Sequence, residues 1–342
     1  MQKQQQTTDG ETGAAEAAEG GVRVVTEALA EELVTRELAF DAVASVFAAM
    51  ARGEARNFPV VREKLGHADA LYGFKSGFDR AGLALGLKAG GYWPGNAERG
   101  LTNHQSTVCL FDPDTGRLSA LVAGNYLTAI RTAASSAVSI EHLARRDART
   151  LGMVGAGHQS TFQLRAAAER RDFERVVAWN PHPEMLPRLR AVAEELGLAF
   201  EAVTPEALGA EADVIITITS AFEPLLRREW IRPGTHLACM GTDTRGKQEV
   251  DAALLAAASV FTDEVAQSVS IGEAQHAIDA GSLVEGDIVP LGRVIDGQHP
   301  GRADDEEITL FDGTGVGLQD LAVAALAARL CEERGLGTRI AF

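Results

Sequence analysis

The segment from Leu151 to Ser160 constrains the fold of this chain more than any other. It reads LGMVGAGHQS, an apolar run that ends in Gly155-Ala156-Gly157 and continues into the helical sequence QSTFQLRAAAERR. A strand followed by glycines and a helix is the phosphate-binding turn of dinucleotide-binding folds. Gly155 permits the tight turn, Gly157 lets the backbone approach a pyrophosphate, and the helix N-terminus offers N–H groups to the phosphates. Ser160 replaces the usual third glycine and is small enough to keep helix and strand close. The segment predicts a Rossmann-type domain.

The rest of the chain divides into two regions of different rhythm. From about residue 148 onward, apolar runs such as ERVVAWN, DVIITITS, HLACMG and ITLFDGTG alternate with helical segments. Such runs are typical of a parallel sheet covered on both faces, and they predict a doubly wound α/β fold. Residues 58–123 show short strand-like segments broken by Gly, Pro and Asn, with helices after Thr35 and over about 126–144. This region predicts a second, α+β domain.

Length, charge and cysteine content narrow the function further. A chain of 342 residues suits two domains, and its formal net charge of −16 disfavours nucleic acid and anionic membranes as partners. No apolar stretch approaches the length of a membrane span. Cys109, Cys239 and Cys331 lack CxxC spacing and the histidines lack metal-ligand spacing, so we predict a reduced, cytoplasmic protein without a bound metal. Residues 1–21 are polar and low in complexity, which predicts a disordered tail.

We predict that the cofactor binds at the carboxyl ends of the parallel strands, where ligands bind in this fold. The strand after the glycine turn ends at Asn180, where an acidic residue would bind the ribose of NAD and an adjacent Arg would accommodate the extra phosphate of NADP. Neither is present, and the missing basic charge favours NAD(H), with NADP(H) as the alternative. The predicted cofactor-binding residues are Gly155, Ala156, Gly157, His158, Gln159, Ser160, Asn180, His182, Thr219, Ser220, Met240 and Gly241.

Four segments together resemble the ornithine cyclodeaminase/μ-crystallin family. They are LTAIRTAASSAVSIEHLA, VGAGHQS, MGTDTRGKQEVD and FDGTGVGLQDLAVA, and the resemblance runs from about residue 33 to about 332. It implies a Rossmann domain, residues 146–315, inserted into a substrate-binding and dimerisation domain made of residues 22–145 and 316–342. It also implies at least a homodimer. Within the family, LYGFKSGF and TDEVAQSVSIGEAQHAI are most similar to members that reduce iminosuccinate to aspartate.

The resemblance also implies a set of site residues. Arg62, Lys88 and Arg131 match positions that contact the substrate, and Arg is suited to gripping a carboxylate with two parallel hydrogen bonds. Asp243, which follows the strand HLACMG, matches the catalytic aspartate. Either Lys88 or Asp243 would handle the proton at the substrate nitrogen, and the sequence leaves this choice open. Lys247 and Glu249, nearby, are expected to be structural.

One departure from the family pattern bears on the substrate. Where other members tend to read Gly-Leu-Pro-Thr, this chain has Gly100-Leu101-Thr102 followed by Asn103 and His104. We expect this polar pair, with Lys75, to contact a second polar group of a dicarboxylate. A purely structural role for His104 is equally consistent with the sequence.

The expected activity is NAD(P)H-dependent reduction of an α-imino acid to an L-amino acid, with iminosuccinate and L-aspartate as the expected pair. An alanine dehydrogenase or ketimine reductase is a near alternative. An ornithine cyclodeaminase would need a carboxylate for the distal ammonium of ornithine, and the substrate segments show no convincing one. A crystallin-like protein that binds NAD(P)H without catalysis is disfavoured by the presence of Lys88, Arg131 and Asp243.

Overall fold

The computed structural model describes residues 21–342, and the chain divides into two compact units. The first unit comprises the described residues up to Thr35 together with Arg56–Thr128 and Asp320–Phe342. The second unit comprises Arg36–Ala55 and Ala129–Gln319. The predicted tail, residues 1–21, lies outside the described residues except for Gly21. Within the described part of the chain, no helix combines the length and apolarity that a membrane crossing requires.

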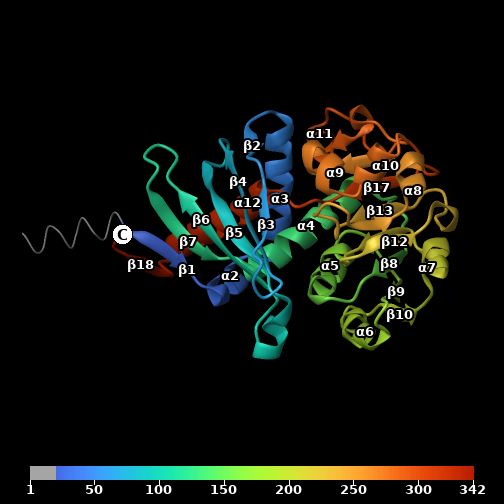
Figure 1. Ribbon diagram of the computed structural model, residues 1–342, viewed down its shortest axis with the longest axis horizontal. Helices are drawn as coiled ribbons and strands as arrows, with labels where there is room; N and C mark the ends of the chain where they lie inside the picture. Colours follow the sequence, from blue (N-terminus) through green and yellow to red (C-terminus); the bar gives the residue numbers. More distant parts are fainter. Residues whose placement is uncertain (1–20) are drawn as a thin grey trace, which may run out of the picture. The chain divides into compact units, whose positions relative to one another are not determined.

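An eight-stranded parallel sheet forms the centre of the second unit (Figure 1). Its order is β10-β9-β8-β11-β13-β17-β15-β16, and each neighbouring pair is parallel. The winding reverses at β8, the strand of the glycine turn, and this confirms the predicted doubly wound α/β fold. The strands are β8 (Thr150–Val154), β9 (Arg175–Trp179), β10 (Ala199–Ala202), β11 (Val214–Thr217), β13 (His236–Cys239), β15 (Ser259–Thr262), β16 (Val289–Pro290) and β17 (Thr309–Asp312).

Helices bury the aliphatic side chains of these strands. Leu208, Leu254 and Ala277, from three helices, join Ile215 and Leu237 of the sheet in one buried cluster. The helices are α3 (Arg36–Ala51), α4 (Asn125–Leu143), α5 (His158–Ala168), α6 (Leu186–Glu195), α7 (Pro205–Glu211), α8 (Ala252–Ala257), α9 (Val265–Ile271), α10 (Gln275–Asp279) and α11 (Leu291–Ile295). Single 3₁₀ turns occur at η2 (Pro183–Met185), η3 (Arg228–Trp230) and η4 (Glu285–Asp287). A small sheet pairs β12 (Phe222–Leu226) with β14 (Gln248–Val250).

The first unit is built on a mixed sheet of order β18-β1-β7-β6-β5-β4-β2, with β3 paired to β4 (Figure 1). A tight turn joins β6 and β7, with the Asp112 carboxylate accepting the N–H of Thr115 at 2.7 Å. Strands β1 and β18 were not predicted, because three or four residues show no periodicity. The elements are β1 (Val22–Val25), α2 (Glu27–Leu33), β2 (Ala55–Asn57), β3 (Val61–Lys64), β4 (Leu71–Asp79), β5 (Ala84–Tyr92), η1 (Pro94–Arg99), β6 (His104–Phe111), β7 (Leu118–Ala123), α12 (Gly317–Glu333) and β18 (Thr338–Ile340).

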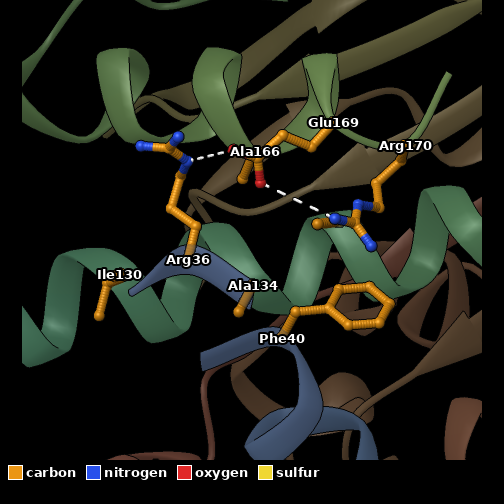
Figure 2. A pocket seen from close by; sticks show the side chains of 8 residues that line it. Arg36, Phe40, Ile130, Ala134, Ala166, Glu169 and Arg170 are labelled. Atoms are coloured by element: carbon orange, nitrogen blue, oxygen red, sulfur yellow. Dashed lines mark hydrogen bonds and ion pairs between the residues drawn. The ribbon is translucent and has the colours of Figure 1, made fainter. Parts of the chain in front are cut away.

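Helix α3 packs with the Rossmann sheet's unit although it lies near the start of the chain. Arg36 donates to the Glu169 carboxylate at 2.5 Å, and the guanidinium of Arg170 lies 4.3 Å from the ring centre of Phe40 (Figure 2). The pocket between these side chains has a volume of about 10 Å³, which is room for one water. These contacts are therefore structural. The domain boundaries predicted at 145 and 316 stay a prediction. The two compact units group residues that contact one another, and such contacts do not show which segments fold independently.

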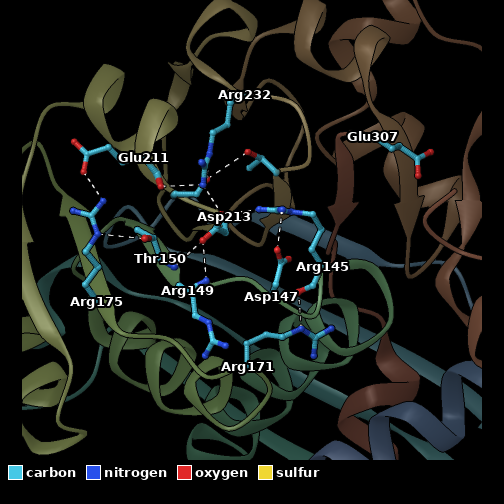
Figure 3. A network of polar contacts seen from close by, with 12 residues as sticks. Arg145, Asp147, Arg149, Thr150, Arg171, Arg175, Glu211, Asp213, Arg232 and Glu307 are labelled. Carbon is cyan, nitrogen blue, oxygen red and sulfur yellow. Dashed lines mark hydrogen bonds and ion pairs between the residues drawn. The ribbon is translucent and has the colours of Figure 1, made fainter. Parts of the chain in front are cut away.

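Asp213 ties together the amino ends of the central strands (Figure 3). Its carboxylate accepts the N–H groups of Arg149 and Thr150 at 2.8 and 2.9 Å and the guanidinium of Arg145 at 2.8 Å. Arg232 donates to the same carboxylate. The side chain of Asp213 is only 10% exposed, so these bonds replace water that the carboxylate has lost. This network lies at the opposite end of the strands from the glycine turn.

We predict that Asp213→Asn lowers the free energy of unfolding by about 2–3 kcal/mol, because an amide cannot accept from all of these donors and two guanidinium groups lose a charged partner. Thermal unfolding should show a decrease in Tm of roughly 5–10 °C. Asp172→Asn is the matched control, since Asp172 also faces an arginine but its side chain is 96% exposed. Equal Tm values for the two variants would contradict the structural role of Asp213.

Candidate functional site

The glycine turn has the geometry that a dinucleotide requires. Gly155 has a φ of +108°, and a Cβ there would lie 2.7 Å from the carbonyl oxygen of Ile218. Any other residue is therefore excluded by both conformation and space. Gly157 has a φ of −73° and begins α5, and a Cβ at this position would meet nothing within 4 Å. The open space beside Gly157, in front of a helix N-terminus, fits a pyrophosphate.

A serine, Ser160, forms a hydrogen bond within the first turn of α5. Ser160 is fully buried, and its hydroxyl donates to the carbonyl of Gly157 at 2.7 Å. The side chain thus packs where the third glycine of the usual pattern would lie. His158 stands at the exposed start of the helix, and burial, with a smaller effect from Arg188, lowers the pKa of its imidazole below the usual value.

Asn180 couples the carboxyl ends of β8 and β9. Its side-chain oxygen accepts the N–H of Ala156 at 3.1 Å, and its amide nitrogen donates to the carbonyl of His182 at 2.8 Å. Gly155 also donates its N–H to the carbonyl of Trp179 at 2.9 Å. The carboxamide is thus used to shape the glycine turn, while the imidazole of His182 is exposed.

Glu249 holds the carboxyl ends of β11 and β13 in the same way. Its buried carboxylate accepts from the hydroxyl of Thr217 at 2.6 Å, from both the N–H and hydroxyl of Thr219 at 2.7 and 2.8 Å, and from the N–H of Gly241 at 2.9 Å. Burial raises the pKa of Glu249 despite these donors. Two residues predicted to bind the cofactor, Thr219 and Gly241, are therefore fixed by the side chain of Glu249, for which a structural role was expected.

The other two predicted cofactor residues at these strand ends differ in exposure. Met240 is buried and donates its N–H to the carbonyl of Thr217 at 2.8 Å, whereas Ser220 is exposed. Their roles in binding the cofactor, like that of Gln159, stay predictions.

Asp243 follows β13 on the loop that continues to β14. Its carboxylate lies 2.8 Å from the ammonium of Lys247, which also donates to the carbonyl of Gly241 at 3.1 Å. Thr244 donates to the same carboxylate oxygen at 3.2 Å. Lys247 therefore orients the aspartate, in agreement with its expected structural role. The side chain of Asp243 remains 28% exposed, so a substrate can reach it.

In the first unit, strand register brings three predicted substrate contacts to one face of the sheet. Arg62 lies opposite Gly73, and Lys75 lies directly opposite Lys88. Directly opposed residues of an antiparallel pair point to the same side, and so do residues two apart along a strand. Arg62, Lys75 and Lys88 therefore share a face.

Lys88 is held by a carboxylate that sequence reasoning missed. Its ammonium lies 2.9 Å from Asp320 of α12 and donates to the hydroxyl of Thr128 at 3.4 Å. The side chains of Lys88 and Asp320 are 8% and 1% exposed. The available signal was an aspartate inside the otherwise apolar segment LQDLAVAALAARL, where a charge requires a partner.

Arg131, in the second unit, is buried within a chain of polar contacts. Its guanidinium donates to the side-chain oxygen of Gln319 at 2.9 Å, and Gln319 donates to the carboxylate of Asp263 at 3.2 Å. Asp263 in turn accepts the N–H groups of Thr314 and Gly315 at 3.1 and 2.7 Å. The chain fixes one side of the guanidinium and supplies the partner that a charge in an apolar helix needs.

The polar pair that departs from the family pattern lies at the start of β6. The carboxamide of Asn103 accepts the N–H of Ala97 at 3.0 Å and donates to the hydroxyl of Tyr92 at 3.1 Å, so it shapes its own loop. His104 begins β6 opposite Tyr92 and is half-buried. Substrate contacts by this pair stay predictions. The predicted absence of a metal also stays a prediction, although the described residues include no group of three or more His, Cys, Asp or Glu side chains that could hold one.

Comparison with known proteins places the whole arrangement in a family. The model of the ornithine cyclodeaminase/mu-crystallin family matches residues 22–334. The chain belongs to this family. The chain is also 62% identical, over 317 residues, to the iminosuccinate reductase of Paracoccus denitrificans (strain Pd 1222), a match that covers 93% of this chain and 99% of the relative.

Two solved structures are similar to this member of the family. One is the crystal structure of the iminosuccinate reductase of Paracoccus denitrificans in complex with NAD⁺, with a TM-score of 0.91, 61% identity, and coverage of 94% of this chain and 100% of that one. The other is an archaeal alanine dehydrogenase dimer with bound NAD, with a TM-score of 0.89, 30% identity, and coverage of 94% and 99%.

The two glycines of the turn allow cofactor binding to be separated from folding in this family member. We predict that Gly157→Ala leaves Tm within about 2 °C of the wild type, because its φ and surroundings accept a Cβ, but weakens NADH binding at least about tenfold by filling the phosphate space. Gly155→Ala should instead lower Tm, since a positive φ and a backbone contact both oppose it. NADH fluorescence titration and thermal unfolding measure the two effects. Unchanged NADH affinity in Gly157→Ala would refute the assignment of the turn.

Proposed function

We propose that this chain is an imine reductase that uses NADH to convert iminosuccinate to L-aspartate. The observation that carries the proposal is the 62% identity to an iminosuccinate reductase over almost the whole of both chains. A turn suited to a pyrophosphate, at the middle of the doubly wound sheet, supports NAD(H) as the cofactor. Fold alone would not name the reaction, because relatives with the same fold carry different names.

The bound cofactor would supply a hydride to the carbon of the substrate's C=N bond. The residues of the chain then have two tasks, which are to hold the carboxylates and to manage the proton at nitrogen. Arg62, Lys75 and Lys88 lie on one sheet face and provide the cation capacity that a dicarboxylate needs. Local cations of this kind matter because the formal net charge of −16 repels an anionic substrate at long range.

We propose that Asp243, and not Lys88, exchanges the proton with the substrate nitrogen. The ammonium of Lys88 is fixed in an ion pair with the buried carboxylate of Asp320, which suits a stationary positive charge that attracts a carboxylate. Asp243 is partly exposed and is oriented by Lys247, which suits a group that exchanges a proton with the substrate nitrogen. Arg131, oriented by Gln319, would bind a carboxylate of the substrate through the rest of its donor fork.

The cyclodeaminase alternative needs an additional carboxylate for the distal ammonium of ornithine. Asp320 is the buried carboxylate beside the proposed cations, and it is already paired with Lys88. Asp79, another acid of this sheet, accepts the N–H of Ala81 in its own turn. These pairings favour the reductase.

We also propose that the chain acts as a cytoplasmic homodimer. The sheet face opposite to the three cations carries large apolar side chains, with Val61, Tyr72 and Phe74 each 37–41% exposed. A contiguous exposed apolar surface of this kind is typical of an association surface. The dimer of the archaeal alanine dehydrogenase supports the same assembly here. The three cysteines are free thiols, as expected in a reducing compartment.

The test of the proposed activity follows NADH absorbance with purified protein, oxaloacetate and a high concentration of ammonium, which together generate iminosuccinate. We expect the fastest oxidation with oxaloacetate, slower reactions with pyruvate, glyoxylate and 2-oxoglutarate, and no reaction without ammonium. Formation of proline and ammonia from L-ornithine with catalytic NAD, in the absence of reaction with any oxo acid, would replace the reductase by a cyclodeaminase.

A second prediction concerns the carboxylate behind Lys88. Asp320→Asn removes the charge that positions the ammonium, so we expect the KM for the imino acid to rise about tenfold with a smaller change in kcat. Glu332→Gln is the matched control on the same helix, because the side chain of Glu332 is 63% exposed and it pairs with Arg23 and Arg339 and not with Lys88. Steady-state kinetics at saturating NADH measure both variants. If Asp320→Asn has the KM of the wild type, Asp320 does not position Lys88.

A further inference from the structure

The loop that carries Asp243 is held from behind by residues 272–276, which read GEAQH and which we call the brace. The buried carboxylate of Glu273 accepts the N–H groups of Glu249 and Val250 at 2.8 and 2.7 Å through one oxygen. Its other oxygen accepts from the hydroxyl of Thr242, the residue immediately before Asp243. Glu273 therefore joins the two ends of the loop formed by residues 241–250.

The next polar residues of the brace hold the middle of the same loop. Gln275 accepts the N–H of Gly246 at 2.7 Å and donates to the carbonyl of Lys247 at 3.3 Å. A ring nitrogen of His276 lies 3.0 Å from that same carbonyl. The brace thus fixes the backbone of Lys247, whose ammonium in turn orients Asp243.

The brace is itself anchored to the sheet. The fully buried carboxylate of Asp312, at the end of β17, accepts from the hydroxyl of Ser268 at 2.6 Å and from the N–H of Ala274 at 3.3 Å. A Cβ at Gly272 would lie 2.5 Å from this carboxylate, so the glycine permits the close approach. The brace therefore fixes the loop relative to the carboxyl end of β17 in the sheet.

We propose that Glu273 is a positioning residue for the reaction, which acts through Thr242, Glu249 and Val250 to hold Asp243 in place and to keep Gly241 at the cofactor. The inference rests on the role proposed above for Asp243. It goes beyond that role because Glu273 would affect catalysis without touching substrate or cofactor.

The brace contains an ionisable carboxyl group, that of Glu273, so its hold on the loop should depend on pH. Burial, and next the neighbouring carboxylate of Glu249, raise the pKa of Glu273 to about 8, and burial raises the pKa of Asp312 to about 7. Burial, and next the carboxylate of Glu273, raise the pKa of the buried Cys239 thiol well above its usual value. Ionisation of Glu273 therefore places a second buried negative charge beside Glu249 and opposes the braced loop at alkaline pH.

The sign of the stability effect follows from the raised pKa. Because the folded-state pKa of about 8 lies above the ordinary value of 4.5, the protonated carboxyl is favoured by folding. That contribution is fully present below pH 4.5 and is lost as the pH rises through 8. Glu273→Gln, which is neutral at every pH, should gain Tm relative to the wild type progressively between about pH 5 and pH 8.

The experiment compares Glu273→Gln and Glu273→Ala with the wild type. The glutamine keeps a side-chain oxygen for the N–H groups of Glu249 and Val250, whereas alanine removes it. For Glu273→Ala we expect amide hydrogen exchange at Glu249 and Val250 to quicken at least tenfold, NADH to bind more weakly, and kcat to fall more than tenfold. For Glu273→Gln we expect near-normal exchange and kcat at pH 7, with activity retained above pH 8 where the wild type declines.

Glu285→Gln, a substitution of an exposed carboxylate in the same unit, is the control and should match the wild type in every readout. The proposal is overturned if Glu273→Ala folds with normal exchange at Glu249 and Val250 and normal kcat, or if Glu273→Gln declines at alkaline pH in parallel with the wild type. If Glu273→Ala does not fold, the pH profile of Glu273→Gln decides alone. If the wild type reduces no imine, the proposed function fails, while exchange and NADH binding still test the brace.

Discussion

At Gly155, the backbone that follows β8 lies against the backbone that follows β11, and the positions of the site residues in the second unit depend on this contact. The carbonyl of Ile218 occupies the space that a side chain at Gly155 would need, so β8 and β11 leave their sheet in contact. The strand order reverses between these two strands, and their connections therefore leave toward opposite faces. Ligands of doubly wound folds bind outside the carboxyl ends of two such strands, so topology selects this edge of the sheet before any particular side chain does. The side chains at this edge then fix the loops around it.

Buried carboxylates carry out that task throughout the site. Glu249 joins the ends of β11 and β13, Glu273 holds the following loop, and Asp263 accepts the N–H groups that follow β17. A carboxylate offers several acceptor positions on two oxygens, so it can satisfy the unpaired N–H groups of more than one loop. Burial raises the pKa of both Glu249 and Glu273, and the neighbouring carboxylate of Glu249 raises that of Glu273 further. We therefore expect the loop that these two carboxyl groups hold to be sensitive to alkaline pH.

The sequence was sufficient for features that depend on local pattern. The parallel sheet follows from continuous apolar strands, the phosphate turn from its glycines, and the helix after Thr35 from spacing of apolar residues. The sequence could not predict which side chains pair when they are distant in the chain. The partner of Lys88 is Asp320, and the partner of Thr242 is Glu273. Short elements such as β1 and β18 were also missed, since their stability comes from pairing with neighbouring strands and not from internal periodicity.

Helix α3 illustrates the limit of inferring domains from chain order. Its start after Thr35 was predictable, yet its partners were not, because salt bridges and a cation–π contact to residues beyond α5 decide where it packs. A segment near the start of the chain thereby becomes part of the second compact unit. Contiguity in sequence gives no information about such contacts.

The residue type at position 180 also follows from structure before function is considered. The side chain must accept the N–H of Ala156 and donate to the carbonyl of His182, and a carboxamide does both. An ionised aspartate would accept but not donate, so it would leave the carbonyl of His182 without this partner. An arginine would donate but not accept, and the N–H of Ala156 would lose its bond within the turn itself. Asn180 is therefore explained by the shape of the glycine turn, before any contact with the cofactor is considered.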